Sequence, residues 1–139
     1  MPRILAIDYG KKRTGIAITD NLQIIAYGLT TVPTDKLLDF LSEYCHKEQV
    51  ELIVMGKPIR SDGTVGEIFN EIKIMAQRIK GICSDINVVF FDEAYTSKNA
   101  VQEMIRGGTK KKYRRKKENI DKMAAALLLQ NYLQSIGKY

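Results

Sequence analysis

The sequence predicts an α/β domain in which helices cover the faces of one mixed β-sheet. Short apolar runs, typical of buried strands, recur along the chain. The first three runs follow one another closely, whereas the later ones alternate with segments whose apolar residues have helical spacing. The 139 residues, 45% hydrophobic and 27% charged, have the size and composition of one globular unit. We therefore expect residues 1–139 to form a single domain.

The first three predicted strands occupy residues 3–8, 14–20 and 23–32. The links between them, residues 9–13 and 21–22, are short. A parallel crossover needs about a dozen residues or more, so these strands are expected to be antiparallel neighbours. The amino-terminal part of the chain therefore predicts a three-stranded meander.

Helices and strands alternate after this meander. Apolar residues at helical spacing predict a helix that begins after Thr34, a candidate N-cap, and three further helices over residues 65–79, 100–105 and 120–135. Two buried strands, residues 51–56 and 86–91, lie between them. Right-handed crossovers place the first, fourth and fifth strands side by side, with the meander at one edge of the sheet.

The positive charge of the chain is concentrated in residues 106–117, which read RGGTKKKYRRKK. This segment holds eight basic residues and no acid, so the remainder of a chain of net charge +6 carries −2. A cationic segment on a slightly acidic body indicates a polyanionic partner. The alternative is a solvated loop without a partner, and residues 107–118 or so are expected to be mobile.

Composition argues against membrane insertion, export and histidine-based metal sites. The longest apolar run, residues 123–129, has seven residues, whereas a membrane span needs about 20. Asp8 lies where a signal peptide would be apolar, so we expect a cytoplasmic protein. Cys45 and Cys83 are predicted to be free thiols of a reducing compartment, and His46 is the only histidine.

Acidic residues follow two of the predicted parallel strands directly. Asp8 comes after the first strand, and Asp92 and Glu93 come after the fifth. Because the carboxyl ends of parallel strands meet at one edge, these acids are expected there. A desolvated acid needs a counter-charge, and a divalent cation is one such partner. The alternatives are a turn-forming role for Asp8 and exposed surface positions for the other two acids.

A fourth acid, Asp121, lies near the start of the last predicted helix. It shares a helical face with Ala124, Ala125 and Leu128. The two alanines allow a close approach to the sheet, which would aim Asp121 at the same edge. The alternative is an acid in the first turn that complements the helix dipole.

Carboxylates that converge without histidine favour a hard cation such as Mg²⁺ or Mn²⁺. Two such ions about 3.5–4 Å apart can promote an in-line phosphoryl displacement. Gly10 and Gly15 in DYGKKRTG allow a tight turn and a close approach of backbone to phosphate. The three cations of residues 11–13 add positive charge beside Asp8. An ordinary hairpin turn with solvated lysines is the alternative.

Four sequence blocks together resemble the YqgF/RuvX family of small bacterial nucleases, which have an RNase H-like fold. In chain order, the blocks are IDYGKKRTGIAITD (7–20), VMGKPIRSDGT (54–64), DEAYTS (92–97) and DKMAAALLLQNYL (121–133). The resemblance implies a five-stranded mixed sheet of order 3-2-1-4-5, with strand 2 antiparallel and helices on both sides. It also implies a hydrolase that processes the 5′ end of precursor 16S ribosomal RNA in ribosome biogenesis. Holliday junction resolution in DNA recombination and repair is the older proposal for the family.

The same resemblance implies that Asp8, Glu93 and Asp121 are the catalytic carboxylates, which bind two Mg²⁺ or Mn²⁺ ions. It places Lys12, Arg13 and Thr96 around them. Other expected contacts to nucleic acid come from Arg60 and from six cations of the basic segment: Lys110, Lys111, Lys112, Arg114, Arg115 and Lys116. Whether Asp92 or Glu93 is the ligand stays open.

Two positions depart from the family pattern. Ala94 replaces an arginine, which questions the rate or the substrate, and Arg60 or the basic segment could compensate. Lys57 replaces a hydrophobic residue before Pro58 and is expected to add charge near the site.

Two other function classes stay open beside the nuclease. One is a module that binds nucleic acid without cleaving it, and Ala94 favours it. The other is a phosphotransferase, because residues 8–15 also resemble the first phosphate loop of actin-like ATPases. The expected partner is structured RNA, with branched DNA as the alternative. The protein itself is expected to be a monomer or a homodimer.

Overall fold

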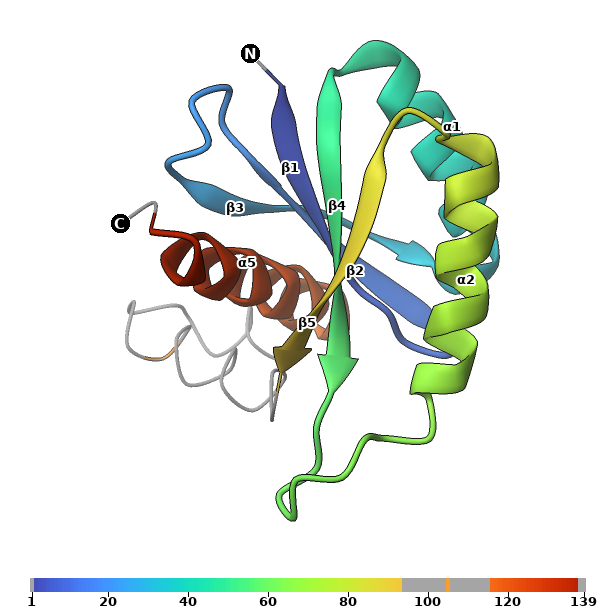
Figure 1. Ribbon diagram of the computed structural model, residues 1–139, viewed down its shortest axis with the longest axis vertical. Coiled ribbons are helices and arrows are strands. Elements are labelled where there is room, and N and C mark those ends of the chain that lie inside the picture. The colour runs from blue at the N-terminus through green and yellow to red at the C-terminus, as the bar shows by residue number, and fades with distance from the viewer. Residues whose placement is uncertain (1, 94–104, 106–115, 138–139) are drawn as a thin grey trace.

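The computed structural model of the protein describes residues 2–93, 105 and 116–137 (Figure 1). The elements in chain order are β1 (Arg3–Asp8), β2 (Arg13–Thr19), β3 (Ala26–Pro33), the short 3₁₀ helix η1 (Thr34–Lys36), α1 (Leu37–Lys47), β4 (Val50–Pro58), α2 (Phe69–Ile82), β5 (Asn87–Glu93) and α5 (Lys117–Ser135). No helix among the described residues is long and apolar enough to cross a membrane.

The five strands form one mixed sheet in the order β3-β2-β1-β4-β5. The meander pairs β1 with β2 and β2 with β3 in antiparallel fashion, whereas β1, β4 and β5 are parallel. This confirms the predicted fold class, strand order and antiparallel second strand. The carboxyl ends of β1, β4 and β5 therefore lie at one edge, where the predicted acids are located.

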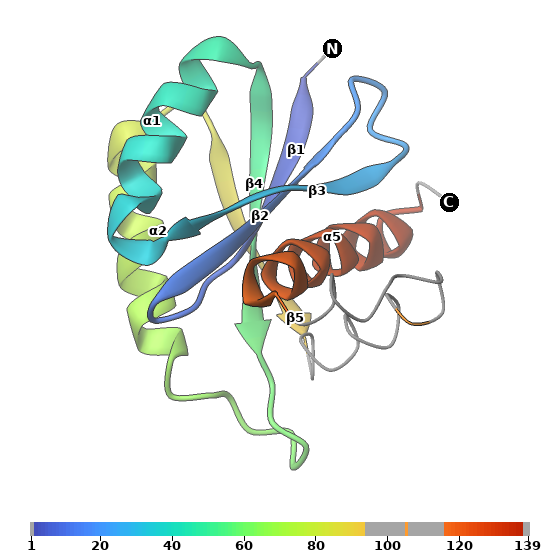
Figure 2. The same cartoon turned by 180° about the vertical axis from the view of Figure 1, so that it is seen from behind.

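The sheet separates two helical layers, with α1 and α2 on one face and α5 on the other (Figures 1 and 2). Side chains alternate between the faces along each strand. In β1, Leu5 and Ile7 pack on the side of α1 and α2, whereas Ile4 and Ala6 pack on the side of α5. Asp8 follows in the same alternation and belongs to the α5 face, so this face carries the site.

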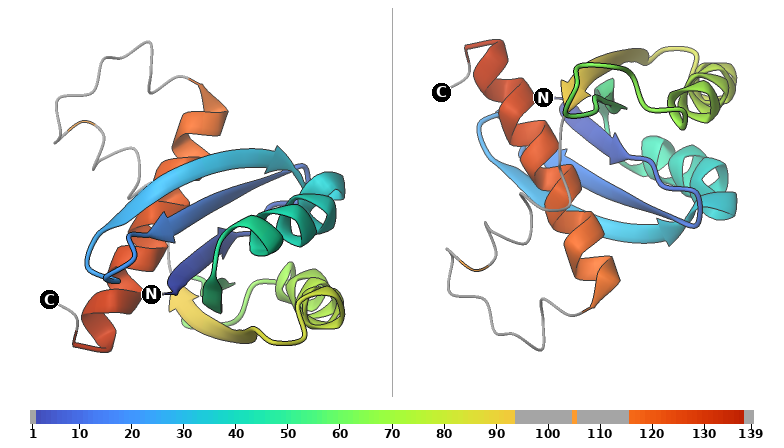
Figure 3. Two further views of the ribbon diagram at one scale, coloured as in Figure 1. Left: turned by 90° about the horizontal axis from the view of Figure 1, so that it is seen from above. Right: turned by 90° about the horizontal axis from the view of Figure 1, so that it is seen from below.

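Small residues line the contact between α5 and the sheet. Ala6 and Ala17 of the strands pack with Ala125 of the helix, which crosses the strands obliquely (Figure 3). A Cβ atom on Gly15 would lie 2.0 Å from the backbone carbonyl oxygen of Asp121. The space beside Gly15 is therefore occupied by the backbone of α5. Glycine at this position lets α5 bring Asp121 close to the sheet.

The boundaries of two helices differ from the predictions. The helical pattern from residue 65 predicted too early a start, because α2 begins at Phe69 and Val65 forms a β-bridge with Ile59. The chain between them closes a loop with Gly63 in the left-handed region at φ 87°. Thr34 is not an N-cap, since its hydroxyl donates to the carbonyl of Gly10 at 2.6 Å.

Several predictions concern residues that the structure does not describe. The helix expected at 100–105 and most of the basic segment belong to this group. Two residues of the loop predicted over 107–118, Lys117 and Glu118, are instead in the first turn of α5. The helix begins three residues before Ile120, the first apolar residue of its pattern.

Candidate active site

Asp8 and Glu93 come together at the carboxyl edge of the sheet. Asp8 is the last residue of β1 and Glu93 is the last residue of β5, with β4 between these strands. The two carboxyl groups are in hydrogen-bonding contact. Residues distant in the sequence thus form an acidic pair, as the resemblance implied.

The surroundings of Asp8 favour its protonated form. Burial raises the pKa of Asp8 well above its ordinary value, and the neighbouring carboxyl of Glu93 raises it further. Asp121 also raises this pKa through repulsion, so it lies within electrostatic reach of Asp8. A hydrogen bond between two carboxyl groups requires a proton on one of them. A bound cation can replace this shared proton.

Strand alternation distinguishes Glu93 from Asp92. Val89 and Phe91 of β5 pack on the α5 side of the sheet, and the Phe91 ring meets that of Tyr132 edge-on at 5.6 Å between centroids. Two residues further along, Glu93 has the same orientation. Asp92 belongs to the opposite face and is exposed. The structure therefore places Glu93, and not Asp92, beside Asp8.

Asp121 reaches the site from the beginning of α5. Its Oδ2 accepts a hydrogen bond from Nε of Arg13 at 2.8 Å, which also forms an ion pair between β2 and α5. The hydroxyl of Thr31 in β3 donates to the carbonyl of Glu118 at 2.7 Å and fixes the first turn of the helix. The acid of that first turn is Glu118, so a dipole-complementing role does not account for Asp121.

The donor set suits a hard divalent cation. Two partly buried carboxyl groups in contact, with a third within electrostatic reach, supply the oxygen ligands that Mg²⁺ and Mn²⁺ prefer. Among the described residues, however, no three Asp, Glu, His or Cys side chains are arranged as a preformed metal-binding group. The carboxylate of Asp121 is instead engaged by Arg13.

The turn between β1 and β2 carries cations next to Asp8. Its tight path needs glycine, because a Cβ atom on Gly10 would lie 2.3 Å from the carbonyl oxygen of Arg13. Lys12 is exposed at the turn, while Arg13 is half-buried against Asp121. The predicted nucleic-acid contact Arg13 therefore also positions an acid of the site.

Of the other residues predicted to contact nucleic acid, the structure describes only Arg60 and Lys116. Arg60 is exposed in the loop after β4, where its Nη2 lies 4.0 Å from Oε1 of Glu67, an acid outside the site. Lys116 is exposed directly before α5. The remaining predicted residues lie outside the described part of the chain: Ala94, Thr96, Lys110, Lys111, Lys112, Arg114 and Arg115.

Lys57 does not add charge to the site face, contrary to expectation. Its ammonium nitrogen lies 5.2 Å from the ring centroid of Phe69, the first residue of α2. Within β4, Met55 packs on the same side and Val54 on the other. Alternation along the strand thus directs Lys57 to the α2 face, across the sheet from the acids.

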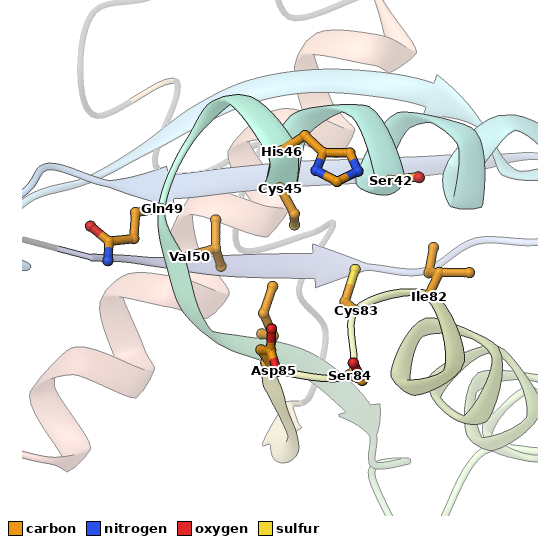
Figure 4. Close-up of a pocket in the computed structure, with 10 residues that line it drawn as sticks. Ser42, Cys45, His46, Gln49, Val50, Ile82, Cys83, Ser84 and Asp85 are labelled. Carbon is orange, nitrogen blue, oxygen red and sulfur yellow. The ribbon is translucent and has the colours of Figure 1, made fainter.

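A pocket of about 240 Å³ lies at the opposite edge of the sheet. Figure 4 shows Cys45 of α1 and Cys83 after α2 among its lining residues, close to Val50 at the start of β4. The thiols hydrogen-bond to each other, and burial together with this neighbour raises the pKa of Cys45 to about 12. Both are free cysteines, as predicted, and this pocket is remote from the carboxylates.

Sequence comparison finds relatives of the RuvX family that match this chain over almost its full length. The model of the RuvX family, described as a Holliday junction resolvase, matches residues 2–135. A protein of Flavobacterium johnsoniae is 48% identical over 135 residues, covering 97% of this chain and 98% of the relative. A protein of Phocaeicola vulgatus is 50% identical over 135 residues, with 97% of each chain covered. Both carry the provisional name pre-16S rRNA nuclease.

Structural comparison finds the same fold in nucleases. RuvC of Thermus thermophilus, solved with a Holliday junction substrate, superposes with a TM-score of 0.60 at 17% identity and covers 99% of this chain and 98% of its own. The fowlpox virus Holliday junction resolvase gives a TM-score of 0.56 at 16% identity, with coverage of 96% and 99%. The fold is therefore that of RuvC-like, RNase H-like proteins. Together with the family match over residues 2–135, this shows that the chain belongs to the RuvX family.

Proposed function

We propose that this protein is a metal-dependent nuclease that hydrolyses phosphodiester bonds at the Asp8–Glu93–Asp121 site. The observation that carries the proposal is the partly buried contact between Asp8 and Glu93 at the carboxyl edge of the sheet. Such a contact between two acids raises the energy of the native state unless a proton or a cation compensates it. Asp121 lies within electrostatic reach and completes an oxygen-rich donor set.

Each side chain of the site has a defined task in this proposal. Asp8, Glu93 and Asp121 would hold Mg²⁺ or Mn²⁺, which would supply an acidified water and positive charge at the scissile phosphate. Arg13 keeps Asp121 oriented toward the sheet edge through its 2.8 Å hydrogen bond. Lys12, exposed on the adjacent turn, contacts the nucleic-acid backbone.

The proposed substrate is the 5′ end of precursor 16S rRNA, as the names of the relatives suggest. Those relatives are 44–50% identical to this chain and match it nearly end to end. A Holliday junction is the second candidate, favoured by the description of the family model. RNA and DNA backbones present the same phosphate to the carboxylates, so the substrate is decided by contacts outside the acidic site.

A cleavage panel tests the proposal. Precursor 16S rRNA, single-stranded RNA, an RNA–DNA hybrid and a four-way DNA junction are incubated with the protein and Mg²⁺ or Mn²⁺. We expect specific cleavage of the precursor, no cleavage with EDTA, and loss of at least about 100-fold in rate for Asp8→Asn, the scale on which catalytic groups act.

Each contrary result identifies another function. Cleavage of the junction alone would make the protein a resolvase. Tight binding to nucleic acid without cleavage under either metal would favour the binding module instead. Stabilisation by ATP, with no effect of nucleic acid, would favour a phosphotransferase.

A further inference from the structure

We infer that Gly56 is a positioning residue of the site, because its missing side chain provides the space in which the Glu93 carboxyl group meets Asp8. Gly56 lies in β4, the strand between those that carry the two acids. The inference rests on the proposed function for its catalytic consequence. Its geometric part stands on contacts within the described residues.

The sheet requires Glu93 to reach across a strand. Neighbouring strands are about 4.8 Å apart, so β1 and β5 are separated by roughly 10 Å. The register pairs Ile7 with Met55 and Gly56 with Phe91, which sets Asp8 next to Gly56. A glutamate that starts from β5 must therefore extend over Gly56 to contact Asp8.

The contacts of Gly56 agree with this path. A Cβ atom placed on it would lie 2.1 Å from Oε1, 2.4 Å from Cδ and 2.9 Å from Oε2 of Glu93. All three atoms belong to the carboxyl group itself. That group therefore occupies the volume that any other residue at position 56 would fill with its own side chain.

The backbone gives no other reason for glycine at this position. Gly56 is not among the residues with positive φ. It lies in regular parallel pairing with β5, a geometry that any amino acid adopts. Glycine inside a strand lowers stability, because it loses more backbone entropy and packs no side chain. Glycine at position 56 thus lowers the stability of β4 but leaves room for the Glu93 carboxyl group.

This arrangement makes Gly56→Ala a selective change. The group that overlaps the new methyl is the end of a flexible side chain, which can swing away, and not a backbone atom. We therefore expect the variant to fold with a Tm within about 5 °C of the wild type. The Glu93 carboxyl group should leave Asp8, lowering Mn²⁺ affinity at least about tenfold and kcat at least about 100-fold. Binding of nucleic acid without metal should stay unchanged. Gly66→Ala is the matched control, since its Cβ would meet Pro58 at an ordinary 3.5 Å.

A double-variant cycle tests whether Gly56 acts through Glu93. Mn²⁺ affinity is measured for Gly56→Ala, Glu93→Gln and the combination, and the combination should bind no more weakly than Glu93→Gln alone. Independent, multiplying losses would overturn the inference. So would a crystal structure of Gly56→Ala with the Glu93 carboxyl group still beside Asp8. A wild-type protein that cleaves no substrate would instead count against the nuclease, because these two readouts need no turnover.

Discussion

At the scale of single residues, the acidic pair makes the metal-free protein less stable than it could be. The pKa of Asp8 is raised by burial and by its acidic neighbours, so the native state holds a proton that the unfolded chain releases. Native-state stability is then lost as pH rises from the ordinary carboxyl range through the raised pKa. The site therefore stores repulsion that a cation can relieve.

Asp8→Asn should stabilise the metal-free protein for this reason. We expect a Tm about 3–6 °C above that of the wild type at pH 8, and a smaller difference at pH 4, where the raised pKa keeps Asp8 protonated in the native state. Differential scanning calorimetry in EDTA measures both values. Added Mg²⁺ should raise the Tm of the wild type but not that of Asp8→Asn. Equal Tm values at pH 8 would contradict the assigned surroundings of Asp8.

Adjacent acids at the end of β5 should differ sharply in function. Glu93→Gln removes a carboxylate from the site and should lower kcat at least about 100-fold. Asp92→Asn changes an exposed side chain on the opposite face and should leave kcat within about twofold. Single-turnover cleavage of the preferred substrate measures both variants. Equal losses would show that the alternation of β5 does not decide the ligand.

The sequence predicts these residues only in part. Acids at strand ends indicated the edge, and the resemblance indicated the three carboxylates. Two features could not be predicted, since both depend on contacts between distant residues. Asp121 pairs with Arg13, which is 108 positions away. Gly56 is needed for a side chain that starts from another strand.

At the scale of elements, the reactivity of the Cys45 thiol measures how well α1 stays packed against the end of α2. With a pKa of about 12, this thiol is almost wholly protonated at pH 8. Its alkylation by iodoacetamide should be at least about tenfold slower than that of an ordinary cysteine of pKa near 8.5. Peptide mass spectrometry over time measures the rate, and the urea-unfolded chain is the control. Similar alkylation rates in the native and unfolded states would indicate that the contact between α1 and the end of α2 opens readily.

The docking of α5 depends on Gly15. A methyl group there would overlap the backbone carbonyl of Asp121, and a helix backbone cannot move without repacking the whole interface. We expect Gly15→Ala to lower stability by about 2–3 kcal/mol and Tm by about 6–12 °C. Thermal unfolding followed by circular dichroism measures this loss.

Gly81 provides the matched control for that prediction. It lies in α2, is exposed, and has open space within 4 Å of the position that a Cβ atom would occupy. Gly81→Ala should therefore stabilise the helix by about 0.5–1 kcal/mol. A Gly15→Ala protein as stable as the wild type would mean that α5 is not held where the structure places it.

Elements were predicted better than their ends. Alternation and helical periodicity identified all five strands and the helices α1, α2 and α5. The start of α2 was misplaced because Val65, although in phase with the helical stripe, forms a bridge with Ile59. Thr34 was misassigned because its hydroxyl bonds to Gly10 of another turn. Both errors come from tertiary contacts that local pattern does not contain.

At the scale of the whole molecule, charge is separated between an acidic body and a basic segment. We expect Lys110→Ala, Lys111→Ala and Lys112→Ala together to flatten the salt dependence of single-strand RNA binding by about 2 log units per log unit of salt, or about 0.7 for each lost contact. Fluorescence anisotropy between about 50 and 200 mM salt measures the slope. Replacing Lys36, Lys47 and Lys80, which are exposed in η1, α1 and α2, removes the same charge and should leave the slope unchanged. Equal slopes in both triple variants would remove the basic segment from the interface.

The order in which the chain is made has a consequence for when it can act. Asp8 and Glu93 belong to strands that a ribosome completes early, whereas Asp121 belongs to α5, which is translated after every strand of the sheet. Until α5 emerges and docks, the nascent sheet lacks both its third carboxylate and the cover of its alanine-lined face. If Asp121 acts as proposed, an unfinished copy of the chain would therefore lack a complete site for hydrolysis until α5 has docked.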